Sequence, residues 1–352
     1  MSKQYRIAVI GVGFGKRVHV PAWRCDPRCE VVAIAATSDD RARQAADELQ
    51  IPDAYGDWRE MLRRDDIDAV SIAVPPDIQA EIALGALRCE KSVLCEKPLS
   101  VSQIDAQNLT EAAFRSGKAH LINFEIPLAL PWQKAKQMLD ENQIGSLCTI
   151  HVDWHVVSNA KASNMDSWKA DADLGGGALN GFVSHVLHYL EWFGGKISRL
   201  CVRLHGDEEQ RGGCDTLVRM WVDFASRATA SVTVDTMAGF GNVHRVELHG
   251  SEGALQLINE SRDYISGFKL LRGGPGDSSM TQVACDATGS ATTDSDVDGR
   301  IQATSAMMKR LVDWMETGQE QNPNFEDGLR VQRLIEEARQ SHLDAAWVDV
   351  AR

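Results

Sequence analysis

The chain has 352 residues, which is enough for two domains, each with its own hydrophobic core. Its formal net charge of −13, with the histidines neutral, argues against nucleic acid or an anionic membrane as the main partner. The 8 cysteines lack the spacing of a zinc or redox site, and no apolar stretch is long enough to cross a bilayer. We therefore expect a cytoplasmic protein with reduced thiols and no bound metal.

The first strand and the turn after it predict a phosphate cradle. The apolar run at residues 7–10 is typical of a strand buried on both faces of a parallel sheet. Gly11, Gly13 and Gly15 follow at once, and a helix-compatible segment begins at Lys16, where Gly or Ala is usual. Small residues let the backbone approach a pyrophosphate, whose charge the first helical turn complements. The alternative is a tight turn that holds no ligand.

Strands and helices then alternate to about residue 122. This alternation predicts an α/β domain over residues 1–122 with the doubly wound parallel sheet of a Rossmann fold. The expected strands cover residues 31–36, 69–74, 92–94 and 119–122, and the expected helices cover residues 39–49, 57–64, 77–88 and 101–116. Such sheets bind ligands outside the carboxyl ends of their strands. We therefore expect a cofactor to contact residues at those ends: Gly11, Gly13, Phe14, Gly15, Thr37, Ser38, Arg41, Val74, Pro75, Gln79, Glu96 and Lys97.

The residues after the second strand bear on the choice between NAD and NADP. An NAD-specific Rossmann fold usually carries an acidic residue about 20 positions after the glycine turn. Ala36 stands there instead, two hydroxyl residues follow it, and Arg41 could reach a 2′-phosphate. Asp39 and Asp40 would repel that phosphate unless they point away as helix caps. We predict that NADP is accepted at least as well as NAD; the alternative is an enzyme that uses either cofactor.

The pattern changes after residue 122. Alternation of apolar and polar residues replaces the buried runs, which indicates a sheet with one wetter face. We expect an α+β domain over residues 123–352 with a large, mostly antiparallel open sheet and C-terminal helices that pack back toward the first domain. The polar, turn-rich residues 273–299 predict a loop. The expected strands cover residues 150–157, 216–224, 228–235, 245–248 and 346–350, with a hairpin turn at 250–253 and helices at 132–139, 301–316 and 326–341.

Several motifs together resemble the glucose–fructose oxidoreductase/inositol dehydrogenase family, often written Gfo/Idh/MocA. They are GVGFG after the first strand, VPP after the strand at residues 69–74, CEKPLS, and GGGALNGFVSH. The resemblance covers nearly the whole chain. It implies NAD(P)-dependent hydride transfer at a hydroxyl or carbonyl carbon of a small polar substrate, such as a sugar, a cyclitol or a derivative. It also implies a homodimer or homotetramer that forms through the open sheet.

The resemblance also implies a catalytic pair. It places Lys97 beside the nicotinamide and the substrate, where a partly desolvated lysine has a lowered pKa and can donate or accept a proton. His185 matches a family histidine, but Gly181 stands where the family's pattern has an Asp. The plain alternatives are a surface lysine and a core histidine. We expect Lys97 and His185 to be catalytic, and further residues to line the substrate pocket: Asn123, His155, Trp168 and Lys169.

A second hypothesis comes from another functional class. The same fold can serve as a cofactor-binding regulator without turnover, since the family that the chain resembles includes a galactose-pathway repressor. The missing Asp at position 181 favours this alternative, and the intact Lys97 favours an enzyme. No DNA-binding module is visible in the sequence, so we expect such a regulator to act through protein contacts.

Overall fold

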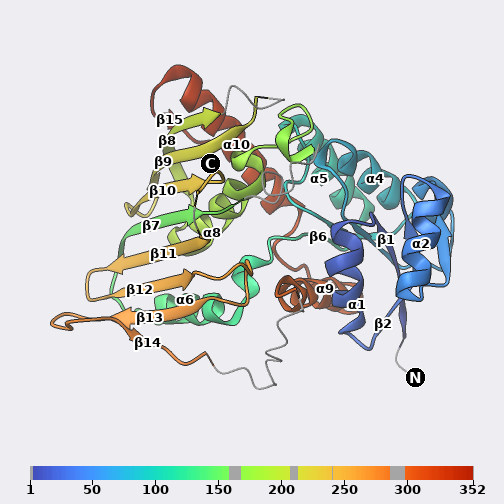
Figure 1. Cartoon of the computed structure of the whole chain (residues 1–352), viewed down its shortest axis with the longest axis horizontal. Coiled ribbons are helices and arrows are strands. Elements are labelled where there is room, and N and C mark those ends of the chain that lie inside the picture. Colours follow the sequence, from blue (N-terminus) through green and yellow to red (C-terminus); the bar gives the residue numbers. More distant parts are fainter. Residues whose placement is uncertain (1–2, 158–167, 207–212, 240, 286–297, 352) are drawn as a thin grey trace. The chain divides into compact units, whose positions relative to one another are not determined.

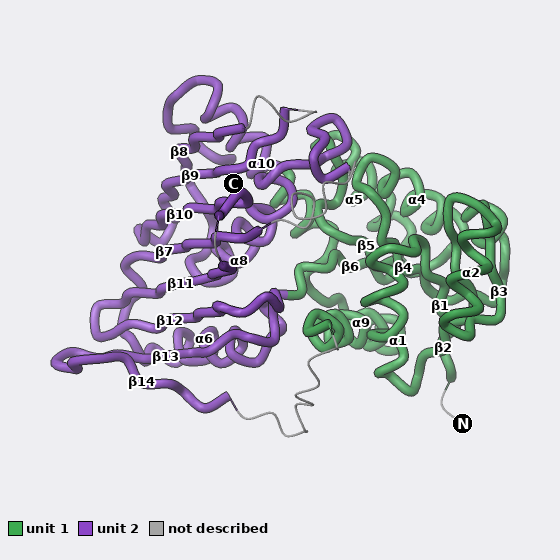
Figure 2. Tube along the Cα trace, viewed as in Figure 1, with its two compact units in different colours: residues 1–125, 297–332 green, residues 126–296, 333–352 purple. Residues whose placement is uncertain are grey.

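The chain divides into two compact units (Figure 2), which are described separately below. Unit 1 consists of Met1–Glu125 and Val297–Gln332, and unit 2 consists of Ile126–Asp296 and Arg333–Arg352. The computed structural model describes residues 3–157, 168–206, 213–239, 241–285 and 298–351. No helix within these ranges is long and apolar enough to span a membrane.

Unit 1 is built on a parallel sheet of six strands in the order β3-β2-β1-β4-β5-β6 (Figure 2). This order confirms the predicted Rossmann sheet. Successive strands are added on one side of β1 up to β3 and on the other side from β4 onward, and doubly wound sheets bind ligands at this switch point between β1 and β4. Every residue of β4 and β5 is buried, as expected for strands covered on both faces. The strands are β1 (Tyr5–Ile10), β2 (Cys29–Ala35), β3 (Asp53–Tyr55), β4 (Ala69–Ile72), β5 (Ser92–Cys95) and β6 (His120–Ile122).

The helices of unit 1 differ from the predicted ones mainly at their starts. The helix after the glycine turn begins with a single π-helical turn, and Ser38 caps the next helix by accepting a hydrogen bond from the Arg41 backbone N–H at 3.4 Å. The cap is therefore not Asp39 or Asp40. The helices are η1 (Gly15–His19), α1 (Val20–Arg24), α2 (Asp39–Leu49), α3 (Trp58–Leu62), α4 (Pro76–Arg88), α5 (Gln103–Ser116), α9 (Arg300–Thr317) and the first part of α10 (Phe325–Asp344).

Unit 2 is built on a sheet of nine strands in the order β14-β13-β12-β11-β7-β10-β9-β8-β15. Only β7 and β10 pair in parallel among these strands, which confirms the mostly antiparallel sheet. The sequence did not predict β8, β12, β13 or β14, and β14 lies inside the stretch predicted as a loop. Residues 286–297 of that stretch lie outside the described residues. The strands are β7 (Leu147–His155), β8 (Ile197–Gly206), β9 (Asp215–Phe224), β10 (Thr229–Asp235), β11 (Val243–Gly250), β12 (Ala254–Asn259), β13 (Lys269–Gly273), β14 (Thr281–Gln282) and β15 (Val348–Asp349).

The core of unit 2 lies on the face of the sheet that α6 (Leu130–Asp140) and α8 (Ser184–Gly194) cover (Figure 1). Trp132 of α6 is fully buried, and its ring centroid lies 4.8 Å from that of Tyr189 and 5.8 Å from that of Phe193, both on α8. Phe268 closes the cluster edge-on at 5.2 Å. On the opposite face, Trp221 of β9 is 48% exposed. The alternation of apolar and polar residues along the strands therefore gives the sheet an inner, buried face and an outer, more exposed face.

We expect Trp132→Ala to destabilise the protein by about 3–5 kcal/mol, because it removes the central ring of this cluster and leaves a cavity. Trp347→Ala is the matched control, since Trp347 is 44% exposed and stacks on Arg199 with the guanidinium carbon 4.7 Å from the ring centroid. The control substitution should lower the free energy of unfolding by less than about 1 kcal/mol. Urea denaturation measures both free energies of unfolding, and equal losses would contradict the assignment of this cluster as the core.

Candidate active site

The residues predicted to contact a cofactor all follow the carboxyl ends of parallel strands in unit 1. This is the edge at which doubly wound sheets bind ligands. By strand, they are Gly11, Gly13, Phe14 and Gly15 after β1; Thr37, Ser38 and Arg41 after β2; Val74, Pro75 and Gln79 after β4; and Glu96 and Lys97 after β5.

The glycine turn has the geometry that a dinucleotide requires. Gly11 has φ +110°, and a Cβ there would lie 2.2 Å from the carbonyl oxygen of Ala73 and 3.5 Å from Val74. A Cβ on Gly13 would point into open space, with nothing within 4 Å, so this is where a ligand can approach the backbone. Gly15 packs closely, because its Cβ position lies 3.4 Å from the Ala73 side chain. The three positions match the tight turn, the close ligand approach and the helix–strand packing of a dinucleotide-binding turn.

Residues from the C-terminal part of the chain complete this turn. The Arg300 guanidinium carbon lies 4.9 Å from the Phe14 ring centroid, and the same ring meets His19 edge-on at 5.3 Å. Asp298 accepts hydrogen bonds from Arg300 at 2.6 and 2.8 Å and pairs with Arg17 at 3.3 Å. The sequence analysis missed Asp298 and Arg300, because they follow a polar stretch more than 280 positions from the turn that they contact.

The turn that carries Lys97 is braced by one buried amide. Gln79 is 1% exposed, and its Nε2 lies within hydrogen-bond distance of the carbonyl oxygens of Glu96 at 2.6 Å, Pro98 at 2.9 Å and Leu99 at 3.2 Å. Its Oε1 accepts a hydrogen bond from the backbone N–H of Glu96 at 3.0 Å. The peptide bond between Lys97 and Pro98 is cis. The polar atoms of the Gln79 side chain are thus engaged with the backbone of residues 96–99.

The Glu96 carboxylate joins several strands of unit 1. Its Oε1 accepts hydrogen bonds from His19 Nε2 at 2.9 Å and from Asn123 Nδ2 at 2.7 Å. His19 Nδ1 lies 2.7 Å from the Ser71 hydroxyl, within hydrogen-bond distance. Burial acts to raise the pKa of Glu96, but the bonds from His19 and Asn123 and the charge of Lys97 hold it below the ordinary value. Glu96 is therefore a fixed negative charge.

Lys97 is partly buried, and charged groups act on it from several elements. Burial lowers its pKa below the ordinary value, against the opposing effects of Glu96 and Glu125 and together with the positive charge of Arg300. A lysine with a lowered pKa exchanges protons more readily near neutral pH. The arrangement can therefore donate or accept a proton at the edge of the sheet where the glycine turn lies.

A basic side chain, Arg41, lies at the start of α2 and contacts the segment after β2. Arg41 Nη1 donates a hydrogen bond to Thr37 Oγ1 at 2.9 Å. The carboxylate of Asp39 is bound elsewhere, since its Oδ1 accepts from the Gly56 backbone N–H at 2.9 Å. The Asp40 side chain is fully exposed. One of the two acidic residues is thus held toward the segment after β3, and a guanidinium lies beside the predicted ribose site.

His185 lies in unit 2, on a helix that follows a segment held by the partly buried side chain of Asp215. It is 6% exposed on α8, and its ring centroid lies 6.3 Å from that of Trp154. Asp215 Oδ2 accepts a hydrogen bond from the Leu179 backbone N–H at 2.6 Å, at the beginning of η4 (Leu179–Val183). A Cβ on Gly177, which has φ +97°, would lie 2.5 Å from Asp215 Oδ1. Asp215 therefore positions the segment that leads into the His185 helix, and the sequence analysis missed it.

The other candidates from the predicted substrate pocket occupy different places. Asn123 belongs to unit 1, where its amide binds Glu96. Trp168 and Lys169 form a 3₁₀ turn, and the Lys169 carbonyl accepts from the Gly177 backbone N–H at 3.0 Å, close to the start of the His185 helix. His155 directly follows Trp154 on β7, so its side chain, 41% exposed, lies on the outer face. The strand geometry thus separates His155 from His185.

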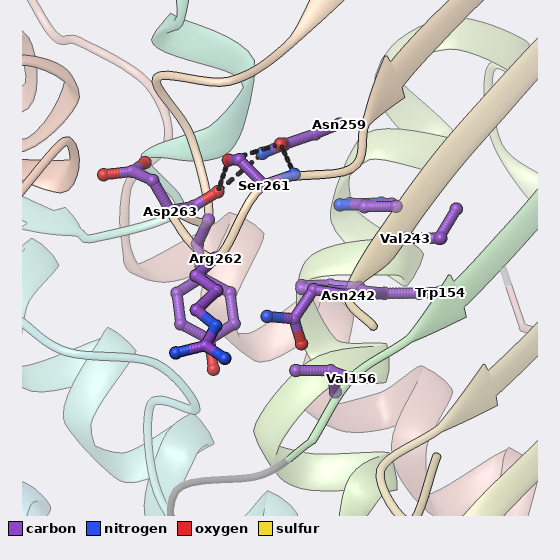
Figure 3. Close-up of a pocket in the computed structure, with 10 residues that line it drawn as sticks. Trp154, Val156, Asn242, Val243, Asn259, Ser261, Arg262 and Asp263 are labelled. Carbon is purple, nitrogen blue, oxygen red and sulfur yellow. Dashed lines mark hydrogen bonds between the residues drawn. The ribbon is translucent and has the colours of Figure 1, made fainter. Parts of the chain in front are cut away.

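A small polar recess in unit 2 is closed by its own hydrogen bonds (Figure 3). Asn259 Nδ2 donates to the Asp263 carbonyl at 2.7 Å, and Asn259 Oδ1 accepts from the Ser261 hydroxyl at 2.8 Å. His244 also lines it and stacks flat on Trp154 with centroids 3.9 Å apart. Burial lowers the pKa of His244 to about 3, so this ring is neutral. The recess is part of the packing of unit 2.

No group of three or more His, Cys, Asp or Glu residues in the described chain could hold a metal ion.

Comparisons with known proteins agree with this geometry. Residues 5–124 match the model of an oxidoreductase family with an NAD-binding Rossmann fold, and residues 132–256 match the Gfo/Idh/MocA C-terminal domain. Levoglucosan dehydrogenase of Pseudarthrobacter phenanthrenivorans is 24% identical over 390 aligned positions that cover 98% of this chain and 97% of the relative. An uncharacterized oxidoreductase of Synechocystis is 26% identical over 364 positions that cover 99% and 97%.

Solved structures share the fold across the whole chain. A levoglucosan dehydrogenase in complex with NADH and levoglucosan has a TM-score of 0.90 at 23% identity and covers 99% of this chain and 100% of its own. An oxidoreductase domain protein from Kribbella flavida has a TM-score of 0.87 at 23% identity, with the same coverage of both chains. With both domain models matched, the glycine turn intact and the CEKP turn in place, the chain belongs to the Gfo/Idh/MocA family of NAD-binding oxidoreductases.

Proposed function

We propose that this protein is an NAD(P)-dependent dehydrogenase or reductase that acts on a hydroxyl or carbonyl carbon of a sugar, a cyclitol or a related polar molecule. The observation that carries the proposal is Lys97, a lysine of lowered pKa on a braced turn at the cofactor edge of the Rossmann sheet. A relative named levoglucosan dehydrogenase supports a sugar-like substrate. Unit 1 would bind the cofactor, and unit 2 would bind the substrate and pair with another copy through the outer face of its sheet.

The chain's own groups suit this chemistry. A nicotinamide dinucleotide, when bound, supplies the acceptor or donor of the hydride. The backbone of Gly11–Gly15 receives the pyrophosphate, and Lys97 Nζ exchanges a proton with the reacting oxygen. In oxidation the neutral amine accepts the hydroxyl proton, and in reduction the ammonium returns it. His185 binds or polarises the same oxygen, while Asn123, Trp168 and Lys169 contribute to the substrate pocket.

Lys97→Met should lower kcat by roughly a hundredfold or more, because it removes the proton-transfer group while keeping an unbranched side chain of similar length. Cofactor affinity and melting temperature should stay close to wild type. Lys118→Met, at a partly exposed position after α5, is the matched control and should keep normal kcat. Steady-state kinetics on a panel of sugars and cyclitols measure the effect. A wild-type kcat in the Met variant would show that Lys97 takes no part in proton transfer.

If the wild-type protein binds a cofactor but turns over no alcohol or ketone, the result would favour the hypothesis of a cofactor-binding regulator without turnover.

His185→Ala should lower turnover more than it lowers the melting temperature, if His185 contacts the reacting oxygen. The reason is that a catalytic contact is lost at the transition state, whereas a core histidine contributes to the folded state alone. Tyr189→Phe is the stability control on the same helix, since it removes a buried hydroxyl that lies 3.1 Å from His244 Nε2, and it should lower the melting temperature more than turnover. Activity and thermal unfolding are measured on the same preparations. A large stability loss with normal specific activity would mark His185 as a core residue.

We propose that NADP binds at least as well as NAD. Arg41 and the hydroxyl of Thr37 offer donors for a 2′-phosphate, and Asp39 is held by the Gly56 backbone N–H. Solved neighbours contain NADH, so the two cofactors must be compared directly. Titration of the apo-protein with NADPH and NADH, followed by nicotinamide fluorescence, gives both Kd values. Arg41→Gln should weaken NADPH binding selectively. NADH binding tenfold tighter than NADPH in the wild type, about 1.4 kcal/mol, would contradict the proposal.

A further inference from the structure

Glu125 is a buried carboxyl group that the chemistry above does not use. Its side chain follows β6, two positions after Asn123, and the residue is 6% exposed. Its Oε2 atom is fully buried and has no hydrogen-bond partner among the described residues. Buried polar atoms are almost always paired, so an unpaired carboxyl oxygen in a functional cluster requires an explanation.

The charged groups that act on Glu125 come from separate elements of unit 1. Glu96 and Lys97 follow β5, and Arg300 is the first residue of α9. Burial and the negative charge of Glu96 raise the pKa of Glu125 to about 7, although Lys97 and Arg300 oppose this shift. His19, on η1, acts on the cluster through its hydrogen bond to Glu96. Near neutral pH the Glu125 carboxyl is therefore present in both its protonated and its ionised form.

The two carboxyl groups of the cluster differ in what they can do. Glu96 already accepts bonds from His19 and Asn123, which keep it ionised. Glu125 has an oxygen that accepts no bond from the described residues and can take up a proton. When the surroundings of two neighbouring carboxyl groups push their pKa values apart, one serves as a fixed charge and the other as an acid or base.

We propose that Glu125 is the proton-exchange residue for Lys97 and that water carries the proton between the two side chains. This inference rests on the oxidoreductase function proposed above. In oxidation, the substrate C–H electron pair leaves as hydride for the oxidised nicotinamide, and the hydroxyl proton passes to the neutral Lys97 amine. Through intervening water, the resulting ammonium gives one proton to the ionised Glu125 carboxylate, which releases it to bulk solvent. Lys97 is thereby neutral again, and the products are a carbonyl, the reduced cofactor and one proton. Reduction runs through the same groups in reverse.

The test compares Glu125→Gln and Glu125→Asp with wild type over pH 5–9 in the oxidation direction. Because only the ionised carboxylate can accept a proton, wild-type kcat should rise with pH through an inflection near pH 7. The Gln variant should lose this inflection and about tenfold in kcat, while the Asp variant should retain it. Cofactor Kd should be unchanged in both. Glu111→Gln, an exposed position on α5, is the control. An unchanged pH profile in Glu125→Gln would overturn the inference.

Two measurements on the apo-protein separate this inference from the proposed function. The carboxyl ¹³C signal that disappears in Glu125→Gln should titrate near pH 7 in wild type, and titration near the ordinary 4.5 would overturn the inference. Since the folded pKa is raised, ionisation of Glu125 opposes folding as pH rises from about 4.5 to 7. The Gln variant should thus melt like wild type at pH 4.5 and at a higher temperature at pH 8. A wild-type protein that binds no nicotinamide cofactor would instead overturn the proposed function.

Discussion

The rest of the site depends on the hydrogen bonds that the ionised carboxylate of Glu96 accepts. It joins the end of β5 to the helix after the glycine turn through His19 and to the end of β6 through Asn123, and His19 extends the link to Ser71 on β4. A buried charge is tolerated only when it is paired and hydrogen-bonded, so these partners must be in place for the turn to adopt its structure. Lys97 is the next residue, and its position follows from this arrangement together with the brace from Gln79.

The parts of the fold that could be predicted from the sequence are those with local signals. Buried apolar runs, the glycine turn and the CEKP motif each carry their information within about ten residues, and they led to the Rossmann sheet and to Lys97. The sheet of unit 2 was harder to predict. Strands β8, β12 and β13 are defined by pairing with strands elsewhere in the sequence, and β14 is only 2 residues long. Their local patterns are too short or too mixed to separate them from turns.

The residues missed at the site share one physical property, which is that their environment is made by distant segments. In the sequence Glu125 resembles any acidic residue before a proline-containing turn, and only the structure shows that it is buried. Asp215 lies at the start of a half-buried strand, and its role becomes visible only when the Leu179 N–H points at it. His155 differs from these residues, because it was expected in the substrate pocket and strand alternation directs its side chain to the outer face.

The return of α9 to unit 1 has a consequence for biosynthesis. Arg300 stacks on Phe14, Arg28 bonds Asp313 and Glu316 at 2.8 and 2.9 Å, and Met307, Met308 and Leu311 of α9 are fully buried. A nascent chain that has left the ribosome as far as Glu125 therefore contains all six parallel strands but leaves the surface that α9 covers open to water. Unit 1 can be completed only after most of unit 2 has been synthesised. Although its parallel sheet is translated first, unit 1 thus reaches its final structure only late in synthesis.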